Sequence, residues 1–373
     1  MDKFLDYKDN VLKKMKPMQA FLNKNMGYIV LAIIIIICLV LYFKIFFRRV
    51  PRALSGMRDM AKLVNPAPLM ENEEVMKGGF RLCDFYIASS YRSYLPYCQY
   101  WDYSSLESIR NVLETGARYI ELDVFPNTFC IDSPPVVCNG EEIGLYNWTT
   151  KLCFEKCIEV IREIAFHSNL RNNSDPLFLC LNIHSNYNYK LLTKIADIIF
   201  RNLGNRMLDP NYSWRTNNLA QTPIKELIGK VIIVSNGTWE QSPMEELVNF
   251  SWDMSFLRNM NHDQLQNTFD QEELRNYNKF NLTRVYPGFT GRDSQNYNPI
   301  ISWLSGCQFV CMNYQSDDMF MRLYIDKFKD ASFILKPPQL RYKPVTYSEP
   351  IPQTPAVDMA PRTKSTPFYS ITY

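Results

Sequence analysis

The stretch that decides the fold is FYIASSYRSYLPYCQYWDYSSLESIRNVLETGARYIELDVF, residues 85–125. Residues 85–90 are apolar or small and predict a buried strand, and residues 118–125 predict a second one. Between them, apolar residues recur at helical spacing over 105–116, and Gly116 ends the predicted helix. A strand, a helix and another strand in this order are typical of a parallel βαβ unit.

The same alternation of strands and helices continues to residue 314. Apolar spacing predicts further helices at 154–166 and 189–204. The predicted strands are 85–90, 118–125, 134–140, 176–184, 230–236, 251–256, 282–287 and 307–314. These strands with their intervening helices predict an α/β protein with a closed, TIM-barrel-like (β/α)8 fold. In such a barrel the functional residues lie at the carboxyl ends of the strands.

The composition limits the classes of function. The chain has 373 residues, of which 46% are hydrophobic, which is enough for a large packed core. Its formal net charge of +3 gives no global electrostatic case for nucleic acid as a partner. None of the cysteines has zinc-finger spacing with partnering histidines, so metal binding through sulfur is not expected. Histidine is scarce, with three residues in the whole chain.

One apolar segment predicts a membrane anchor. Residues 27–43, GYIVLAIIIIICLVLYF, are uncharged and have no polar face, which predicts a transmembrane helix over 26–47 after a polar segment at 1–25. A signal peptide fits less well, because the run is long and no small-residue cleavage site follows it. We therefore expect a single-pass membrane protein. Basic residues flank the span on both sides, so the positive-inside rule leaves its orientation open. A virion or host membrane of a large DNA virus would suit this architecture and the Asn- and Ile-rich composition.

A linker, a globular region and a tail are predicted to follow the span. Prolines and a Gly-Gly pair mark 48–79 as a juxtamembrane linker. The barrel is expected over 80–343. Residues 344–373 are rich in proline and have no apolar periodicity, which predicts an extended tail that is disordered or laid on a partner.

Several long motifs in the globular region are shared with one enzyme family. They are SSYRSYL at 89–95, DPLFLCLNIHSN at 175–186, LTRVYPGFTGRDSQNYNP at 282–299 and GCQFVCMNYQS at 306–316. On these motifs the region resembles the catalytic barrel of eukaryotic-type phosphoinositide-specific phospholipase C, with an X half at about 80–236 and a Y half at about 248–343. The resemblance implies the barrel fold and phosphoric diester hydrolase chemistry on phosphatidylinositol-type lipids.

The family's acid–base histidines are replaced here. The resemblance places Tyr91 and Asn139 at the two histidine positions, so no intact catalytic residue is expected. Each acid–base group contributes roughly 10²–10⁴-fold to a rate, so the loss of both is hard to survive. His184 is the one histidine near the predicted site, and the resemblance implies a packing role for it. His262 lies in a divergent insertion and is expected to be exposed.

The family's calcium site is also altered. Glu121 and Asp123 keep a Glu-x-Asp pair of ligands, whereas Arg92 replaces an asparagine ligand and Asn182 replaces a glutamate ligand. We therefore expect a vestigial metal site with no calcium and no other cofactor. We expect Arg92 to pair with both carboxylates and to replace calcium as their counter-ion. The alternative is that Arg92 points to solvent while the carboxylates accept backbone hydrogen bonds. Some bacterial relatives use an arginine in place of calcium and remain active, so Arg92 alone does not exclude catalysis.

Three further family positions line the ligand pocket and could still contact a ligand here: Ser255, Arg284 and Tyr286. The favoured interpretation is a membrane-anchored phospholipase C-like protein that is catalytically inactive and acts as a binding or structural module. The alternative is a divergent, active phosphodiesterase that cleaves phosphatidylinositol-type lipids in lipid signalling. The expected partners are the membrane, through the N-terminal helix, and lipid head groups or other proteins, through the barrel and the Pro-rich tail.

Overall fold

The computed structural model describes residues 2–373 apart from several short segments. Outside the description lie 101, 128–131, 141–147, 186, 216–217, 238, 253–256, 289–293 and 345–360. The chain divides into two compact units, Met1–Tyr342 and Lys343–Tyr373.

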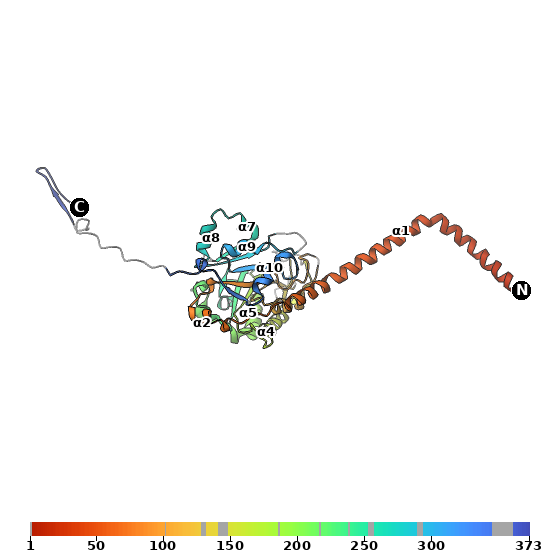
Figure 1. Ribbon diagram of the computed structural model, residues 1–373, viewed down its shortest axis with the longest axis horizontal. Coiled ribbons are helices and arrows are strands. Elements are labelled where there is room, and N and C mark those ends of the chain that lie inside the picture. Colours follow the sequence, from red (N-terminus) through yellow and green to blue (C-terminus); the bar gives the residue numbers. More distant parts are fainter. Residues whose placement is uncertain are drawn as a thin grey trace. The chain divides into compact units, whose positions relative to one another are not determined.

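The first unit is built around a barrel of parallel strands (Figure 1). Within the described residues the barrel strands are β1 (Phe85–Ser90), β2 (Tyr119–Pro126), β5 (Leu177–Ile183), β6 (Val231–Gly237), β7 (Phe250–Ser251), β8 (Leu257–Asn261), β9 (Leu282–Tyr286) and β10 (Phe309–Met312). They follow the order β7-β6-β5-β2-β1-β10-β9-β8, with β1 paired in parallel to both β2 and β10. The predicted (β/α)8 class is confirmed, but the barrel is nearly closed rather than closed, because β7 and β8 end the path without pairing in the described residues.

The seam between β7 and β8 also explains an error in the predicted strands. The sequence predicts one strand at 251–256, whereas the structure has β7 ending at Ser251 and a separate β8 at 257–261. Residues 253–256, which include the predicted pocket residue Ser255, lie outside the described residues. The polar composition of β8, LRNMN, gave no strand signal in the sequence.

Helices cover the outside of the barrel. They are α3 (Leu106–Glu114), α4 (Phe154–Ala165), α5 (Tyr189–Leu203), α6 (Ile224–Leu227), α7 (His262–Gln266), α8 (Gln271–Tyr277), α9 (Pro299–Leu304) and α10 (Met319–Phe328). Short antiparallel strands β3 (Pro135–Val137), β4 (Leu152–Cys153) and β11 (Phe333–Leu335) extend the sheet. The 3-10 helices are η1 (Leu69–Glu71), η2 (Leu82–Asp84), η3 (Gly204–Arg206), η4 (Pro210–Tyr212), η5 (Leu219–Gln221), η6 (Pro243–Glu246) and η7 (Pro338–Leu340).

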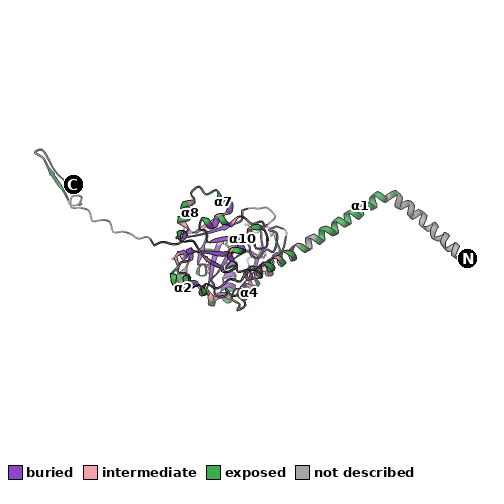
Figure 2. Ribbon diagram, in the orientation of Figure 1, coloured by how far each residue is buried: buried purple, intermediate pink, exposed green. Residues whose placement is uncertain are grey.

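The alternation of side chains along the strands separates two regions of the core. On β2, Ile120, Leu122 and Val124 belong to the large apolar cluster that includes the helices. Tyr119 belongs to the second cluster, which fills the barrel interior with aromatic and apolar residues of other strands. Because side chains on a strand alternate between two faces, Glu121 and Asp123 share the inward face with Tyr119. Figure 2 shows the strands as the buried centre of this unit.

The N-terminal helix corrects the predicted linker. Helix α1 runs from Asp2 to Ala61, so the first part of the predicted linker at 48–79 is helical. Met57 and Met60 are 1% and 6% exposed and belong to the same apolar cluster as residues of α3. Leu54, Met57 and Met60 recur three residues apart, which places them on one helix face. The prolines and glycines of 48–79 indicated a linker, although this short amphipathic pattern is present in the sequence. Further on, α2 (Glu73–Gly78) follows η1 in place of an open linker.

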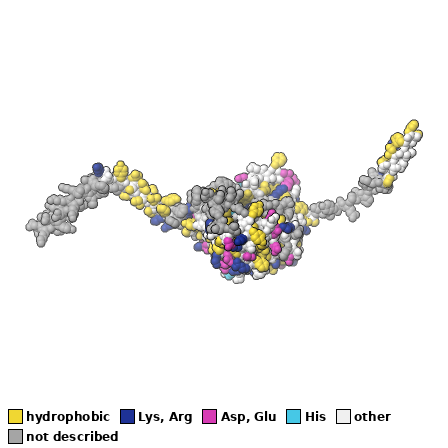
Figure 3. All heavy atoms as spheres, turned by 180° about the vertical axis from the view of Figure 1, so that it is seen from behind, with side chains coloured by type: hydrophobic (Ala, Val, Ile, Leu, Met, Phe, Trp, Pro, Cys, Tyr) yellow, Lys and Arg dark blue, Asp and Glu magenta, His cyan; other side chains and the backbone are white. Residues whose placement is uncertain are grey.

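The apolar part of α1 agrees with the predicted span in length and composition. Among the described residues, one helical stretch, Lys24–Ala61, is long and apolar enough to cross a membrane. Its large apolar side chains between residues 30 and 43 are exposed (Figure 2). Figure 3 shows hydrophobic side chains along this part of α1. In length and composition this stretch therefore agrees with the predicted membrane anchor.

The second unit contains a hairpin that the sequence does not predict. Strands β12 (Thr363–Ser365) and β13 (Ser370–Thr372) pair antiparallel, whereas an extended tail was expected over 344–373. Both strands are exposed.

The burial of Met57 predicts that this part of α1 belongs to the folded unit. Met57→Ala should lower the free energy of unfolding by about 2–5 kcal/mol, since it deletes a buried side chain from a packed cluster. Leu63→Ala is the control, because Leu63 is 69% exposed and should change stability by no more than about 0.5 kcal/mol. Denaturant unfolding of the two full-length variants would test this, and equal stabilities would contradict the packing described here.

Candidate functional site

The predicted site residues converge at the carboxyl end of the barrel strands. Asp123 on β2 lies directly beside Asn182 on β5 in the strand register, and Glu121 lies one inward-facing position earlier. Arg92 follows β1, and Arg284 lies on β9 from the other half of the chain. The predicted convergence of these positions at one mouth of the barrel is confirmed by their mutual contacts.

Glu121 is neutralised from the second half of the barrel. The Nη2 atom of Arg284 forms a short ion pair with Oε2 of Glu121, and both side chains are buried. The Nη1 atom of Arg284 donates to Oδ1 of Asn259 at 2.8 Å. Burial raises the pKa of Glu121, and Arg284 opposes this effect by favouring the charged form. Arg284, expected to be a ligand-pocket residue, is therefore the principal partner of Glu121.

Asn182 joins the two carboxylates. Its Nδ2 atom donates to Oε1 of Glu121 at 2.9 Å and to Oδ1 of Asp123 at 2.6 Å. The hydroxyl of Tyr94 donates to Oδ2 of Asp123 at 2.6 Å. An amide group thus stands where the family has a negatively charged glutamate, and it offers hydrogens to the carboxylates rather than oxygens to a metal.

Arg92 supplies the second cation, as predicted, but to one carboxylate. Its Nε atom lies 3.2 Å from Oδ2 of Asp123, and its Nη1 atom donates to Oε1 of Gln99 at 3.0 Å. The described contacts contain no ion pair between Arg92 and Glu121, whose partner is Arg284. The predicted counter-ion role therefore holds for Asp123, and the solvent-pointing alternative for Arg92 is wrong.

The backbone at Arg92 keeps an unusual conformation. Its φ of 43° lies in the left-handed region, which asparagine adopts more readily than arginine. The family asparagine would suit this turn with less strain. This conformation costs arginine on the order of 1–2 kcal/mol, and from it the side chain reaches Asp123.

Tyr91 packs as an aromatic side chain. Its ring stacks on that of Tyr286, with ring centroids 6.0 Å apart and planes 13° apart. Burial is the main cause that raises the pKa of Tyr91 to about 12, with Glu121 and Asp123 acting in the same direction. The phenol therefore stays protonated at neutral pH and cannot act as a general base there.

Asn139 is held by the polypeptide around it. Its Nδ2 atom donates to the carbonyl oxygen of Gln99 at 2.5 Å, and its backbone N–H donates to Oγ1 of Thr149 at 2.9 Å. Asn139 is 3% exposed. An amide has no titratable proton near neutral pH, so this residue cannot supply the acid–base function of a histidine.

Neither His184 nor His262 is placed to take over from the two histidines that Tyr91 and Asn139 replace. The ring of His184 stacks on Phe125, with centroids 4.2 Å apart and planes 7° apart, which agrees with a packing role. The expectation that His262 is exposed is wrong: it is 8% exposed and stacks on Tyr297 at a centroid distance of 4.4 Å. Burial lowers the pKa of His262. The polar residues around His262 indicated an exposed loop, whereas His262 lies on α7, which packs against the barrel.

Sequence reasoning missed three residues of this network: Tyr94, Gln99 and Asn259. Tyr94 and Gln99 lie in the loop after β1, and Asn259 lies on the unexpected strand β8. Their spacing follows no pattern of a strand or helix face, so the sequence contains no signal that marks them. The fold alone brings them to Asp123, Arg92 and Arg284.

The residues present do not fit a calcium ion. Calcium takes six to eight oxygen ligands, several of them carboxylates. Here the two carboxylates already pair with two guanidinium groups and accept from Asn182. Across the described residues, no group of three or more His, Cys, Asp or Glu side chains could hold a metal. The arrangement holds two buried carboxylates in a charge-balanced network.

The buried pair between Arg284 and Glu121 predicts a large and specific effect on stability. Arg284→Met should lower the free energy of unfolding by about 3–5 kcal/mol, because it leaves a carboxylate buried without its cation. Adding Glu121→Gln to that variant should restore much of the loss. Arg258→Met is the control, since the pair of Arg258 with Glu273 is partly exposed and is worth at most about 1 kcal/mol. Denaturant unfolding of the variants checks this, and equal losses for Arg284→Met and Arg258→Met would contradict it.

Comparisons with known proteins agree with this fold. Residues 80–236 match the phosphatidylinositol-specific phospholipase C X domain, and residues 232–339 match the Y domain. Human inactive phospholipase C-like protein 1 is 25% identical over 314 residues, which cover 70% of this chain and 27% of that protein. Human 1-phosphatidylinositol 4,5-bisphosphate phosphodiesterase zeta-1 is 25% identical over 332 residues, 73% of this chain and 53% of the relative.

A solved structure shares the barrel. PLC21 of S. officinalis superimposes with a TM-score of 0.61 at 24% sequence identity, over 74% of this chain and 38% of that chain. The chain thus spans between about a quarter and a half of the length of these relatives. With both halves of the barrel matched, the chain belongs to the phosphatidylinositol-specific phospholipase C family.

Proposed function

We propose that this protein is a membrane-anchored, catalytically inactive phospholipase C-like barrel that serves as a binding or structural module. The observation that carries the proposal is the identity and environment of Tyr91 and Asn139. A protonated phenol stacked on Tyr286 and a buried amide stand at the two acid–base positions.

The chemistry of phosphodiester cleavage supports inactivity. Attack by a neighbouring hydroxyl needs a base for that hydroxyl, stabilisation of the charge on phosphorus and an acid for the leaving group. The described site has no free base, and the cations Arg92 and Arg284 are engaged by Asp123 and Glu121. The names of the relatives do not decide the question, because they include both an inactive protein and a phosphodiesterase.

The packing of α1 on the barrel supports an orientation in which the candidate site faces the membrane. Arg49 on α1 lies 3.5 Å from Asp102 and 5.7 Å from the ring centroid of Tyr97. Both residues belong to the segment after β1, at the carboxyl end of the strands. Arg49 follows the end of the apolar run at Phe43 by six positions of helix, a rise of about 9 Å. If α1 spans a membrane, the site end of the barrel lies close to its surface.

This placement suits a module that binds lipid head groups or other proteins at the membrane. The segment after β1 presents Tyr97 and Tyr103, which are 38% and 45% exposed, and Arg49 lies over the ring of Tyr97. Tyrosine and arginine are favoured side chains at a membrane surface. A barrel held rigidly at the end of a helix would present the same face to every partner.

A lipid hydrolysis assay tests inactivity. The full-length protein in vesicles of phosphatidylinositol, or of its phosphorylated forms, should release no inositol phosphate above background, with or without calcium. An active family member serves as the positive control. The runner-up, a divergent active phosphodiesterase, predicts measurable turnover that is lost in Tyr91→Phe but kept in Tyr97→Phe, and that result would overturn the proposal.

A pair of truncations tests the anchor. Deletion of residues 1–47 removes the apolar run but keeps Arg49 and Met57, so the remaining protein should fold and stay in the supernatant after membranes are sedimented. Deletion of residues 1–61 removes the helix that packs on α3 and should give an unstable protein. Retention of the shorter truncation in washed membranes at the level of the full chain would contradict anchoring through α1.

A further inference from the structure

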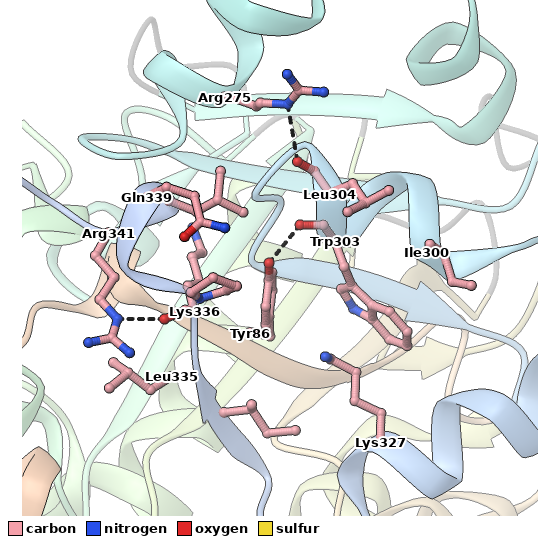
Figure 4. Close-up of a pocket in the computed structure, with 13 residues that line it drawn as sticks. Tyr86, Arg275, Ile300, Trp303, Leu304, Lys327, Leu335, Lys336, Gln339 and Arg341 are labelled. Carbon is pink, nitrogen blue, oxygen red and sulfur yellow. Dashed lines mark hydrogen bonds between the residues drawn. The ribbon is translucent and has the colours of Figure 1, made fainter.

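A cavity of about 660 Å³ opens at the other end of the barrel from the carboxylates. Its wall includes Tyr86 near the amino end of β1, the last turns of α9 and α10, and residues 334–341 (Figure 4). These elements lie where the barrel strands begin, whereas Arg92 follows the end of β1. The cavity is therefore separate from the site described above, and its volume is in the usual range for a small-molecule pocket.

The charged groups that line the cavity all have one sign. Four basic residues and no acidic residue line it: Arg275, Lys327, Lys336 and Arg341. Arg341 lies 3.8 Å from a carboxylate oxygen of Glu74, whereas Arg275 donates to the carbonyl of Leu304 through its Nε atom and pairs with no carboxylate in the described residues. Arg275 therefore adds positive charge to the wall, together with the two lysines.

Lys327 and Lys336 bring two ammonium groups to one aromatic ring. Their Nζ atoms lie 4.9 Å and 5.9 Å from the ring centroid of Tyr86, and Nζ of Lys327 also lies 4.5 Å from that of Trp303. Figure 4 shows Tyr86 and Trp303 beside each other with Lys327 near them. Lys336 is fully buried and donates to the carbonyl of Asn278 at 3.2 Å.

Neither lysine forms an ion pair with a carboxylate in the described part of the chain. The nearby carboxylate of Asp84 accepts from the backbone N–H groups of Arg81 and Tyr342. Burial lowers the pKa of Lys336 to about 8 and also lowers that of Lys327. The carboxylate of Asp84 favours the charged form of Lys336, whereas burial alone acts on the half-buried Lys327. A partly desolvated cation without a carboxylate partner is costly, and a bound anion would remove that cost.

We propose that this cavity binds the phosphate group of a small phosphorylated molecule, with Lys327 as the counter-charge that contacts it and the buried Lys336 adding to the positive potential behind the wall. The apolar side chains of Ile300, Leu304 and Leu335 complete the wall and leave room for the organic part of the ligand. A concave site lined by basic side chains and by no acidic one suits a compact, doubly charged group better than an extended acidic peptide. The inference does not depend on the proposed function, because the cavity shares no residue with the carboxylate network.

The test measures pyrophosphate binding to the full-length protein in neutral phosphatidylcholine nanodiscs by titration calorimetry. Lys327→Met should weaken binding at least about tenfold, since it removes a charge-assisted contact and keeps the apolar stem. Lys329→Met is the matched control: it removes the same charge near the same helix end, but Lys329 pairs with Asp326 and does not line the cavity. The control should bind within about twofold of wild type.

Arg275→Met provides a second variant on the opposite wall, and its exposed position keeps the fold intact. It should weaken binding in the same direction as Lys327→Met.

Vesicles of phosphatidylcholine with phosphatidic acid form the second arm and distinguish a lipid head group from a soluble ligand. If pyrophosphate binds and its binding is lost in Lys327→Met but kept in Lys329→Met, a soluble ligand is supported. If only the vesicles with phosphatidic acid bind, and that binding is lost in Lys327→Met but kept in Lys329→Met, a lipid phosphate is supported. No binding of either probe, or equal binding by both lysine variants, overturns the proposal.

Discussion

The structure at the barrel mouth depends on the need to neutralise two buried carboxylates on one strand. Glu121 and Asp123 are 1% and 4% exposed, and their side chains point the same way because they are two residues apart on β2. Two unpaired negative charges in that position would repel each other across a medium of low dielectric constant. The chain supplies one guanidinium group for each, and Asn182 bridges them.

The ion pair between Arg284 and Glu121 also connects the two halves of the barrel. Glu121 belongs to the X half and Arg284 to the Y half, so their ion pair crosses between segments that are far apart in sequence. A metal would supply the same charge from solution, and its occupancy would vary with concentration. An arginine supplies it permanently, because the guanidinium group keeps its proton at any pH that the folded protein meets. The network therefore places permanent ion pairs at the position where the resemblance puts the metal ligands of the family.

The fold could be predicted from the sequence because the strong strands and helices have clear periodicity. The strand–helix–strand order of 85–125 and the apolar strands β5 and β6 correspond to the structure almost residue for residue. Strand β8 and helix 48–61 were missed, because the first is polar and the second is interrupted by Pro51. For weak local signals, tertiary packing decides the conformation.

The candidate site was predictable only in part. The family motifs identify the positions of Glu121, Asp123 and Arg92, and strand alternation predicts that the two carboxylates lie side by side. The division of the arginines was not predictable, since it depends on the relative position of β9 and β2 in space. The same holds for Tyr94 and Asn259, which reach the site through a loop and through an unpredicted strand.

The two ends of the barrel differ in how their charges are balanced. At the carboxyl end, positive and negative side chains are matched one to one within the chain. At the amino end, Lys327 and Lys336 share the ring of Tyr86 and have no carboxylate partner in the described residues. A network with matched charges has no unpaired charge for a further ion to neutralise, whereas the half-buried cation of Lys327 is stabilised by an anion in the cavity. The charge distribution therefore favours a bound anion at the amino end of the barrel.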